Sequence, residues 1–396
     1  LPPVVIGMLD GDWRCAARRY RAWADKNFFK VQPKAEWVQN MTGWQRIIMR
    51  SQYGEDYYTA KDLPRIYEEG AKCGIHTLFL FAWWREGMDR AYPIYKEPFV
   101  GAFDELKKNI QKVQDMGGRV ILECNCHFLD PQGDYYKQYG DEVKLLDING
   151  NEVRPAFAYP GMGEFRITYG AKQFPLCCAG TERWREQLMA QMRQLRSLEA
   201  DCLFADCYGG TPYQPCFNHR HEHGLRIDEE WIYHRKFFDK AVEYCKEENR
   251  VFAVEVVTDI AAAYTQFIHG LVNVDFKVKS DAFPALFRYT FPEVITTERG
   301  IRSEEGDFDR QLRCALVSGM RLDAELYVCR ADLGASPKYA AEAKRYTDIQ
   351  TEYAEFLLRG RFTVLDTSAL PYYIKRGEYY SEDGTKVLRI LYNAAQ

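Results

Sequence analysis

Motifs that mark several common classes of protein are missing from this sequence of 396 residues. No run of apolar residues is long enough to span a bilayer, and no N-terminal stretch has the pattern of a signal peptide. Neither GxGxxG nor a Walker A motif is present, which argues against a nucleotide cofactor. A GxSxG serine elbow is absent too, and the formal net charge is only −4. The sequence therefore predicts no cofactor, no nucleic-acid partner and no membrane span.

Cysteine is present as 12 residues, but without the spacing of a zinc ribbon or of a small disulfide-rich domain. Several cysteines, such as Cys73 and Cys245, fall inside apolar segments, where the thiol behaves as a small hydrophobic group. This usage favours a reducing compartment without deciding it. The chain starts at Leu1 and ends in a strand-like segment, so we interpret it as a module of a longer protein. Compartment and oligomeric state stay open.

Short apolar segments alternate with amphipathic ones along most of the chain, a pattern typical of parallel strands joined by helices. The predicted strands are 44–49, 76–83, 119–124, 202–205, 251–256, 272–278, 294–297 and 322–328. Eight strands with intervening helices predict an α/β fold of the (β/α)8 TIM-barrel type. An open doubly wound sheet is the alternative, but the phosphate-binding loop that often accompanies it is absent.

Three regions are expected around this repeat. Residues 1–42 form an N-terminal segment with a helix, 43–360 the barrel, and 361–396 the start of a C-terminal β-rich domain. The rhythm is interrupted after the third strand by a long insertion, 129–180, with a hairpin signal at Asn149-Gly150. Long insertions of this kind are usually functional lids or binding walls.

Two acidic residues stand at the ends of neighbouring predicted strands. Asp206 follows the strand 202–205 directly, and Glu255 lies near the end of 251–256. The carboxyl ends of parallel strands are where α/β proteins build sites. Because adjacent strands lie about 5 Å apart, the two carboxylates can face one ligand, as hydrolysis of a glycosidic bond requires. The structural alternatives are that Asp206 caps the next loop and that Glu255 is neutralised by a cation inside the barrel.

Other polar and aromatic residues are expected near the same strand ends. Aromatic residues make up 15% of the chain, and flat rings in loops suit the faces of sugars. The candidate substrate-binding residues are Trp44, Trp83, Trp84, Asp89, Glu123, Asn125, His127, Tyr208, His219, His221 and Arg321. Taken one at a time, each of these is more readily explained as a structural partner than as a ligand contact.

A loop after the fourth predicted strand contains Cys216, His219, His221 and His223. His-x-His in an extended chain places both rings on one face, and cysteine is a soft ligand for zinc. The spacing matches no standard zinc signature, however, and the cluster lies ten or more residues beyond the strand. We therefore assign no metal and expect these side chains to bind a ligand or to pack within the loop.

Two groups of motifs resemble a known family. The N-terminal segments Gly11–Trp13 and Ala16–Trp23, together with Leu203–Asp206, Pro215–His219 and His221–Gly224, are similar to a group of barrel proteins called domain of unknown function 6259. That group is similar to glycoside hydrolase families 101 and 129, which are α-N-acetylgalactosaminidases. More distantly it resembles the α-galactosidase superfamily. The resemblance covers most of residues 1–360.

The resemblance implies a nucleophilic aspartate at the end of the fourth strand and an acid/base tens of residues later. These roles fall on Asp206 and Glu255, while the more distant superfamily would place the acid/base on the sixth strand, at Asp275 or Asp281. We therefore predict a retaining α-glycoside hydrolase, of α-galactoside or α-N-acetylgalactosaminide type, with a carbohydrate substrate. The alternatives are a barrel that binds glycan without cleaving it and a metal-dependent hydrolase that uses His219, His221 and His223.

Overall fold

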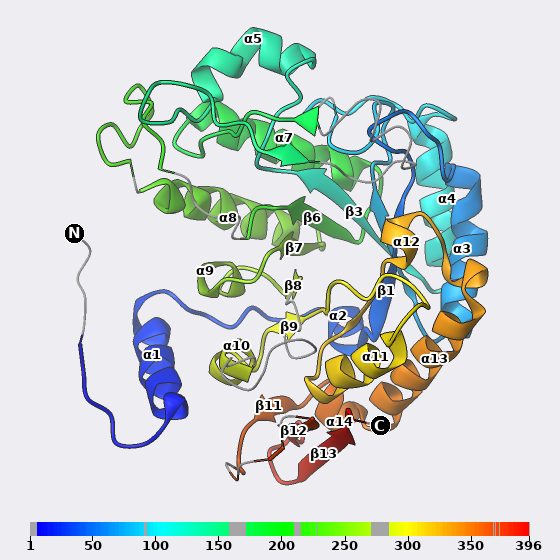
Figure 1. Cartoon of the computed structure of the whole chain (residues 1–396). Helices are drawn as coiled ribbons and strands as arrows, with labels where there is room; N and C mark the ends of the chain where they lie inside the picture. The colour runs from blue at the N-terminus through cyan, green and yellow to red at the C-terminus, as the bar shows by residue number, and fades with distance from the viewer. Residues whose placement is uncertain are drawn as a thin grey trace.

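The structure is a computed structural model that describes residues 6–90, 93–157, 172–209, 215–227, 229–270, 285–366, 368, 370–371 and 373–395. Its centre is one eight-stranded parallel sheet with the strand order β10-β1-β2-β3-β6-β7-β8-β9 (Figure 1). The strands are β1 (Gly43–Ile48), β2 (Thr77–Phe81), β3 (Arg119–Asn125), β6 (Cys202–Asp206), β7 (Val251–Glu255), β8 (Phe267–His269), β9 (Ile295–Thr296) and β10 (Leu322–Ala324). The predicted alternation of strands and helices is thus confirmed.

Helices cover the outside of this sheet, as Figure 1 shows. The long ones are α3 (Leu63–Lys72), α4 (Phe103–Asp115), α7 (Glu182–Ser197), α8 (Glu230–Glu247), α11 (Phe308–Val317) and α13 (Pro337–Glu352). Shorter ones are α2 (Glu36–Asn40), η1 (Ala60–Asp62), α9 (Asp259–Ala262), α10 (Ala285–Thr290), α12 (Leu326–Cys329), η3 (Leu333–Ala335) and α14 (Ala354–Leu357). Most strands are buried along their whole length, as expected for a parallel sheet covered by helices. No helix in the described part of the chain is long and apolar enough to cross a membrane.

The two outer strands of the sheet also meet. A parallel bridge joins Thr297, just after β9, to Arg321, just before β10. The Arg321 amide donates to the Thr296 carbonyl at 2.8 Å, and the Glu298 amide donates to the Arg321 carbonyl at 3.0 Å. The first and last strands in the sheet order are therefore hydrogen-bonded neighbours at this point.

The sixth strand lies elsewhere than expected. The sequence predicted a strand over 272–278 and none over 267–269. In the structure α9 ends at Ala262 and β8 occupies Phe267–His269, whereas residues 271–284 lie outside the described residues. Ile268 pairs with Val254 of β7 on one side and with Thr296 of β9 on the other. Three residues carry little local signal, so it is this pairing on both sides that selects the strand.

The region between β3 and α7 contains α5 (Asp134–Val143) and a small sheet of β4 (Ala156–Phe157) and β5 (Lys172–Gln173). The predicted turn is present: the Asp147 amide donates to Asn151, and Leu146 and Glu152 form an antiparallel bridge. Gly150 has a φ of +81°, which glycine adopts without strain. Residues 158–171 lie outside the described part.

The two ends of the chain pack on the outside of the sheet. Helix α1 (Trp13–Asn27) lies beside α10, where Arg21 forms an ion pair with Glu293 at 2.8 Å (Figure 1). Strands β11 (Arg361–Thr363), β12 (Ile374–Tyr380) and β13 (Val387–Asn393) form an antiparallel sheet. This sheet contacts α11 through Tyr379, whose hydroxyl donates to the Val317 carbonyl at 2.5 Å.

Candidate active site

Four strands end in a polar residue at the same edge of the sheet. Asn125 ends β3, Asp206 ends β6, Glu255 ends β7 and His269 ends β8. Asn125 lies opposite Asp206 in the register, and Glu255 lies opposite His269. All four side chains are buried. Because parallel strands present their carboxyl ends together, the apolar strands bring these groups to one edge of the sheet.

Asp206 and Glu255 are close neighbours. One carboxylate oxygen of each, together with the Cys207 sulfur, forms a group in which all atoms lie within 4.8 Å of one another. The Cys207 thiol lies 3.5 Å from Asp206 Oδ2 and 3.3 Å from Glu255 Oε2. This arrangement fits a pair of carboxylates that acts on one atom, since retaining glycosidases separate theirs by about 5–5.5 Å.

A cation completes the pair. Arg299, in the segment after β9, forms an ion pair with Glu255. Its charge also reaches Asp206, whose pKa it lowers, but the opposing effects are larger. Burial, followed by the charges of Glu255 and Glu123, raises the pKa of Asp206 well above its usual range. The surroundings of Asp206 therefore favour its protonated form, whereas Glu255 has a cationic partner.

Two further acids surround this pair. Glu123 on β3 is fully buried, and its charge acts on Asp206. Asp89, in the segment after β2, is buried as well, and burial together with the charge of Glu255 raises its pKa to about 7. The structure thus brings together four carboxyls and one guanidinium. Perturbed carboxyls concentrated at the ends of strands are typical of catalytic sites.

The backbone is strained immediately after three strands of the parallel sheet. The φ angles of Ala82, Cys207 and Val256 are +51°, +58° and +74°, and these residues follow β2, β6 and β7 directly. A positive φ is unfavourable for any residue with a Cβ and most of all for a β-branched one such as Val256. Such strain persists only where the surrounding fold imposes it, and it is concentrated at functional sites.

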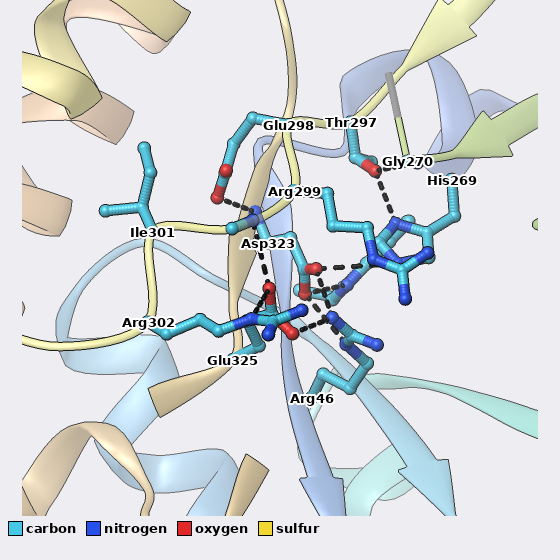
Figure 2. Close-up of polar contacts among 12 residues, drawn as sticks. Arg46, His269, Gly270, Thr297, Glu298, Arg299, Ile301, Arg302, Asp323 and Glu325 are labelled. Atoms are coloured by element: carbon cyan, nitrogen blue, oxygen red, sulfur yellow. Dashed lines mark hydrogen bonds and ion pairs between the residues drawn. The ribbon is translucent and has the colours of Figure 1, made fainter. Parts of the chain in front are cut away.

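A second charged cluster lies beside the first, within the sheet. Figure 2 shows Arg46, Asp323 and Glu325 pointing toward one another. Arg46 pairs with Asp323 at 2.7 Å and also with Glu325, and Arg302 pairs with Glu325 at 2.8 Å. His269 lies 3.6 Å from Asp323. The opposite charges in this cluster offset one another, and the pair of Arg46 with Asp323 links β1 to β10.

Asn125 ends β3 and His127 follows two residues later, and both side chains have polar atoms that make no hydrogen bond to the described residues. The Asn125 side-chain oxygen accepts from the amides of His127 and Phe128. Its Nδ2 and both ring nitrogens of His127 are buried without a hydrogen-bond partner among the described residues. Burial also lowers the pKa of His127 to about 4, so its ring is neutral. Unsatisfied buried polar atoms are costly, which makes both side chains candidates for ligand contacts.

The aromatic candidates are located differently. Trp44, Trp83, Trp84 and Tyr208 are all at most 1% exposed. Trp44 donates to Asp323 at 2.7 Å, Trp83 and Trp84 form an edge-to-face pair covered by Tyr95, and Tyr208 stacks on His234. These rings fill the core because burying a large aromatic surface stabilises the fold more than exposing it. The expectation that they stack on a sugar is corrected, and we leave them out of the proposed site.

Arg321 is also misplaced by sequence reasoning. It precedes β10, at the amino-terminal edge of the sheet, and donates to the carbonyls of Leu357 and Leu358 at 2.6 and 2.8 Å. It therefore supports the packing of the last helices, and its position at the wrong end of the strand excludes it from a site at the carboxyl ends. The alternative acids Asp275 and Asp281 lie outside the described residues.

The loop histidines are separated by the structure. His219 is exposed, and its Nδ1 lies 3.2 Å from the Gly224 carbonyl. His221 and His223 are buried with Cys216, and Cys178 from the segment before α7 joins them. The four potential ligand atoms lie within 4.8 Å of one another. His221 and His223 thus pack within the loop, which is one of the two expected outcomes, whereas His219 lies apart from them.

Sequence reasoning missed Arg299 and Cys207 as members of the site. Arg299 follows a strand of only two residues, so its position at a strand end could not be recognised. Cys207 adjoins Asp206 in the sequence, but its contact with Glu255 depends on the pairing of β6 with β7. The acidic strand ends were recognisable because each follows an apolar run.

Several solved structures with the same fold are glycoside hydrolases. The α-N-acetylgalactosaminidase NagBb from Bifidobacterium bifidum superposes with a TM-score of 0.67 at 14% identity, over 96% of this chain and 63% of NagBb. The GH36 α-galactosidase AgaA from Geobacillus stearothermophilus gives 0.63 at 11% identity, over 97% of this chain and 51% of AgaA. An α-galactosidase from Lactobacillus brevis gives 0.61 at 12%, over 96% and 49%.

This chain therefore spans between about half and two thirds of the length of these structures. At such low identity the superposition shows a common fold but does not establish the substrate or the mechanism. No curated protein matches the sequence. The model of one family, described as a domain of unknown function, matches residues 3–295, which is more than half of the chain. The prediction made from the N-terminal and strand-four motifs is confirmed, and the chain belongs to the DUF6259 family.

Proposed function

We propose that this protein is a retaining α-glycoside hydrolase whose carboxyl pair is Asp206 and Glu255. The observation that carries the proposal is the distance between the two carboxyls, at most 4.8 Å between one oxygen of each, at the carboxyl ends of adjacent strands. Retention needs a short separation because one carboxyl attacks the sugar directly, whereas inversion needs room for a water. The fold shared with glycoside hydrolases supports the same reaction class.

The proposal includes a closed (β/α)8 barrel over residues 43–360. The bridge between Thr297 and Arg321 supports closure, since it joins the first and last strands of the sheet order. Residues 1–42 would be an N-terminal segment packed on the barrel, and 361–396 the start of a further β domain. In a closed barrel the site lies at the carboxyl-terminal mouth, and Asp206 and Glu255 are both there.

The substrate we propose is an α-galactoside or an α-N-acetylgalactosaminide. The structural neighbours that support this choice are an α-N-acetylgalactosaminidase and two α-galactosidases. Asp89, Glu123 and Asn125 would contact sugar hydroxyls, since the first two interact electrostatically with the carboxyl pair and Asn125 lies opposite Asp206 in the register. His127, which is buried two residues beyond Asn125, would add a contact through a ring nitrogen. Two carboxyls suffice for this hydrolysis, so the mechanism requires no cofactor.

The resemblance assigns the nucleophile to Asp206 and the acid/base to Glu255. Asp206 would attack the anomeric carbon to form a glycosyl-enzyme while Glu255 gives its proton to the leaving oxygen and later activates water. The charges of the site favour the opposite assignment, because the pKa of Asp206 is raised while Glu255 pairs with Arg299. Both assignments of the nucleophile and the acid/base use the same two carboxyls. They predict different products for the Asp206 and Glu255 variants.

The first experiment compares Asp206→Asn and Glu255→Gln on 4-nitrophenyl α-galactoside and α-N-acetylgalactosaminide. We expect Asp206→Asn to lower kcat/KM by roughly 10³-fold or more, and added azide to yield the β-glycosyl azide. Glu255→Gln should keep more activity on these activated substrates than on alkyl glycosides, and azide should yield the α-glycosyl azide. NMR of the azide products distinguishes the two variants. Exchanged product configurations would exchange the two roles within the pair.

A matched control is Asp141→Asn, because the Asp141 side chain is 92% exposed. It should leave kcat/KM unchanged. Wild-type activity in both Asp206→Asn and Glu255→Gln would contradict the proposal. Binding of these glycosides by the wild-type protein without any turnover would instead support a barrel that only binds glycan.

A further inference from the structure

We propose that Cys178, Cys216, His221 and His223 bind one structural zinc ion that fastens the loop after β6 to the segment before α7. Their sulfur and nitrogen atoms lie within 4.8 Å of one another, and all four side chains are buried. Two thiolates and two imidazoles are a common ligand set of structural zinc sites. The site is separate from the carboxyl pair, and it does not depend on the glycosidase proposal.

The spacing of the ligand atoms suits zinc. The Cys216 sulfur lies 3.4 Å from Nδ1 of His221. A tetrahedral site with Zn–S near 2.3 Å and Zn–N near 2.0 Å separates its sulfur and nitrogen ligands by about 3.5 Å. The cluster therefore needs little rearrangement to hold the ion.

Both imidazoles are oriented by carbonyl oxygens. Nε2 of His221 lies 3.0 Å from the Glu142 carbonyl, and Nδ1 of His223 lies 3.1 Å from the Gly224 carbonyl. A carbonyl only accepts hydrogen bonds, so the nitrogen facing it carries the hydrogen and the other ring nitrogen keeps its lone pair. The lone pair of His221 then faces Cys216. Carbonyls that fix the tautomer in this way are typical of the outer shell of zinc sites.

One buried atom has no other explanation among the described residues. Nε2 of His223 is buried and makes no hydrogen bond to any of them. A buried imidazole nitrogen with its lone pair unused is costly, and a metal ion would satisfy it. The Gly180 amide lies 3.3 Å from the Cys178 sulfur, which an N–H···S bond would stabilise as a thiolate. Zinc with two thiolates has no net charge, so the complex can be buried.

The ligands come from two distant segments. Cys178 precedes α7. The other three ligands lie on the loop that connects β6, which ends at Asp206, to α8. With four protein ligands the ion has no open position for water, so it would be structural rather than catalytic. The proposed ligand set differs from the cluster of three histidines considered from the sequence, because the ring of His219 lies by the Gly224 carbonyl instead.

The test is the metal content of the full chain, purified after expression with added zinc and measured by plasma mass spectrometry. We expect about one zinc ion per chain in the wild type and in His219→Ala, a matched control from the same loop. We expect the content to fall at least fivefold in His223→Gln and Cys216→Ser.

Cobalt(II) substitution of the wild-type protein keeps the test decisive even where a variant fails to fold. We expect thiolate-to-cobalt charge-transfer bands and the strong visible absorption of tetrahedral cobalt. A metal-free wild type, a Cys178–Cys216 disulfide in the purified chain, or wild-type zinc content in both variants would overturn the proposal. The zinc content and the rate of glycoside hydrolysis are measured separately. A metal-free protein that hydrolyses glycosides would contradict the zinc proposal alone, so the two proposals can be tested independently.

Discussion

At the scale of single residues, the site is a group of acids that cannot all be charged together. The charges of Glu255, Glu123 and Asp89 act on Asp206, which is buried, and Arg299 offsets part of this negative charge. Like charges in a buried site raise one another's pKa, which keeps part of the group protonated near neutral pH. Glycoside hydrolysis uses such a mixed state, with one carboxyl protonated and another ionised.

Asp89→Asn should make the protein more stable at high pH. The folded protein raises the pKa of Asp89 to about 7, above the value of 3.8 expected for the unfolded chain, so the native state binds this proton more tightly. Wild-type stability from this group is thus present at low pH and falls as the pH rises from about 4 to 7. The asparagine amide does not titrate, so its contribution to stability does not change with pH. Asparagine also tolerates the φ of +60° found at this position.

Urea unfolding at several pH values would measure this effect. The gain of Asp89→Asn over the wild type should be small near pH 4 and reach roughly 2–4 kcal/mol at pH 8. A gain that is equal at both pH values would show that Asp89 does not titrate in this window.

At the scale of elements, the loop after β6 crosses the end of β7 at close range. The Gly209 amide donates to the Glu255 carbonyl at 2.8 Å, and the Thr258 hydroxyl donates to the Gly209 carbonyl at 2.5 Å. A Cβ on Gly209 would lie against the carbonyl oxygens of Glu255 and Val256. Glycine at this position lets the two strand ends that carry the carboxyl pair approach each other.

Gly209→Ala should therefore disturb the pair. The added methyl group must displace the backbone at Glu255, and we expect a loss of about 1–3 kcal/mol in unfolding free energy together with a fall in kcat/KM. Gly7→Ala is the matched control, because the nearest atom to its Cβ is 3.8 Å away, at the end of the Arg19 side chain. Equal stability and activity of the two variants would mean that the loop accommodates the methyl group.

At the scale of the whole molecule, the C-terminal sheet is fastened to the helical layer. Tyr379 of β12 is buried, and its hydroxyl donates to the carbonyl of Val317 at the end of α11. Gly377 lies against the same carbonyl, where a Cβ would collide. Phe362 of β11 packs edge-to-face on the Tyr379 ring, so the contact combines apolar packing with a buried hydrogen bond.

Tyr379→Phe keeps the ring and removes the hydroxyl. The Val317 carbonyl then loses a buried donor, and we expect the free energy of unfolding to fall by about 1–3 kcal/mol. Tyr380→Phe is the control on the same strand, because neighbouring residues of a strand point to opposite faces of the sheet. If thermal unfolding shows the same midpoint for both variants, the hydroxyl contributes nothing to the attachment of the sheet.

Local pattern was enough to recognise much of this protein. Buried parallel strands such as β2 and β6 read as continuous apolar runs, and helices such as α4 and α8 show a regular periodicity, so both follow from composition over a few residues. The acids Asp206 and Glu255 were recognisable for the same reason, since each ends an apolar run. The family followed from short motifs at the N-terminus and after β6.

Tertiary structure decided whatever depends on partners distant in sequence. The strand β8 has three residues, and only its pairing with β7 and β9 makes it a strand. Trp83 and Trp84 were predicted to contact a sugar, but both rings pack on Tyr95 and are buried. Arg299 and Glu255 are 44 residues apart in the sequence but form an ion pair. Cys178 and Cys216 lie close together although α7 and β6 separate them along the chain. Spacing along the chain cannot show such contacts, because the fold alone sets which side chains share a low-dielectric interior.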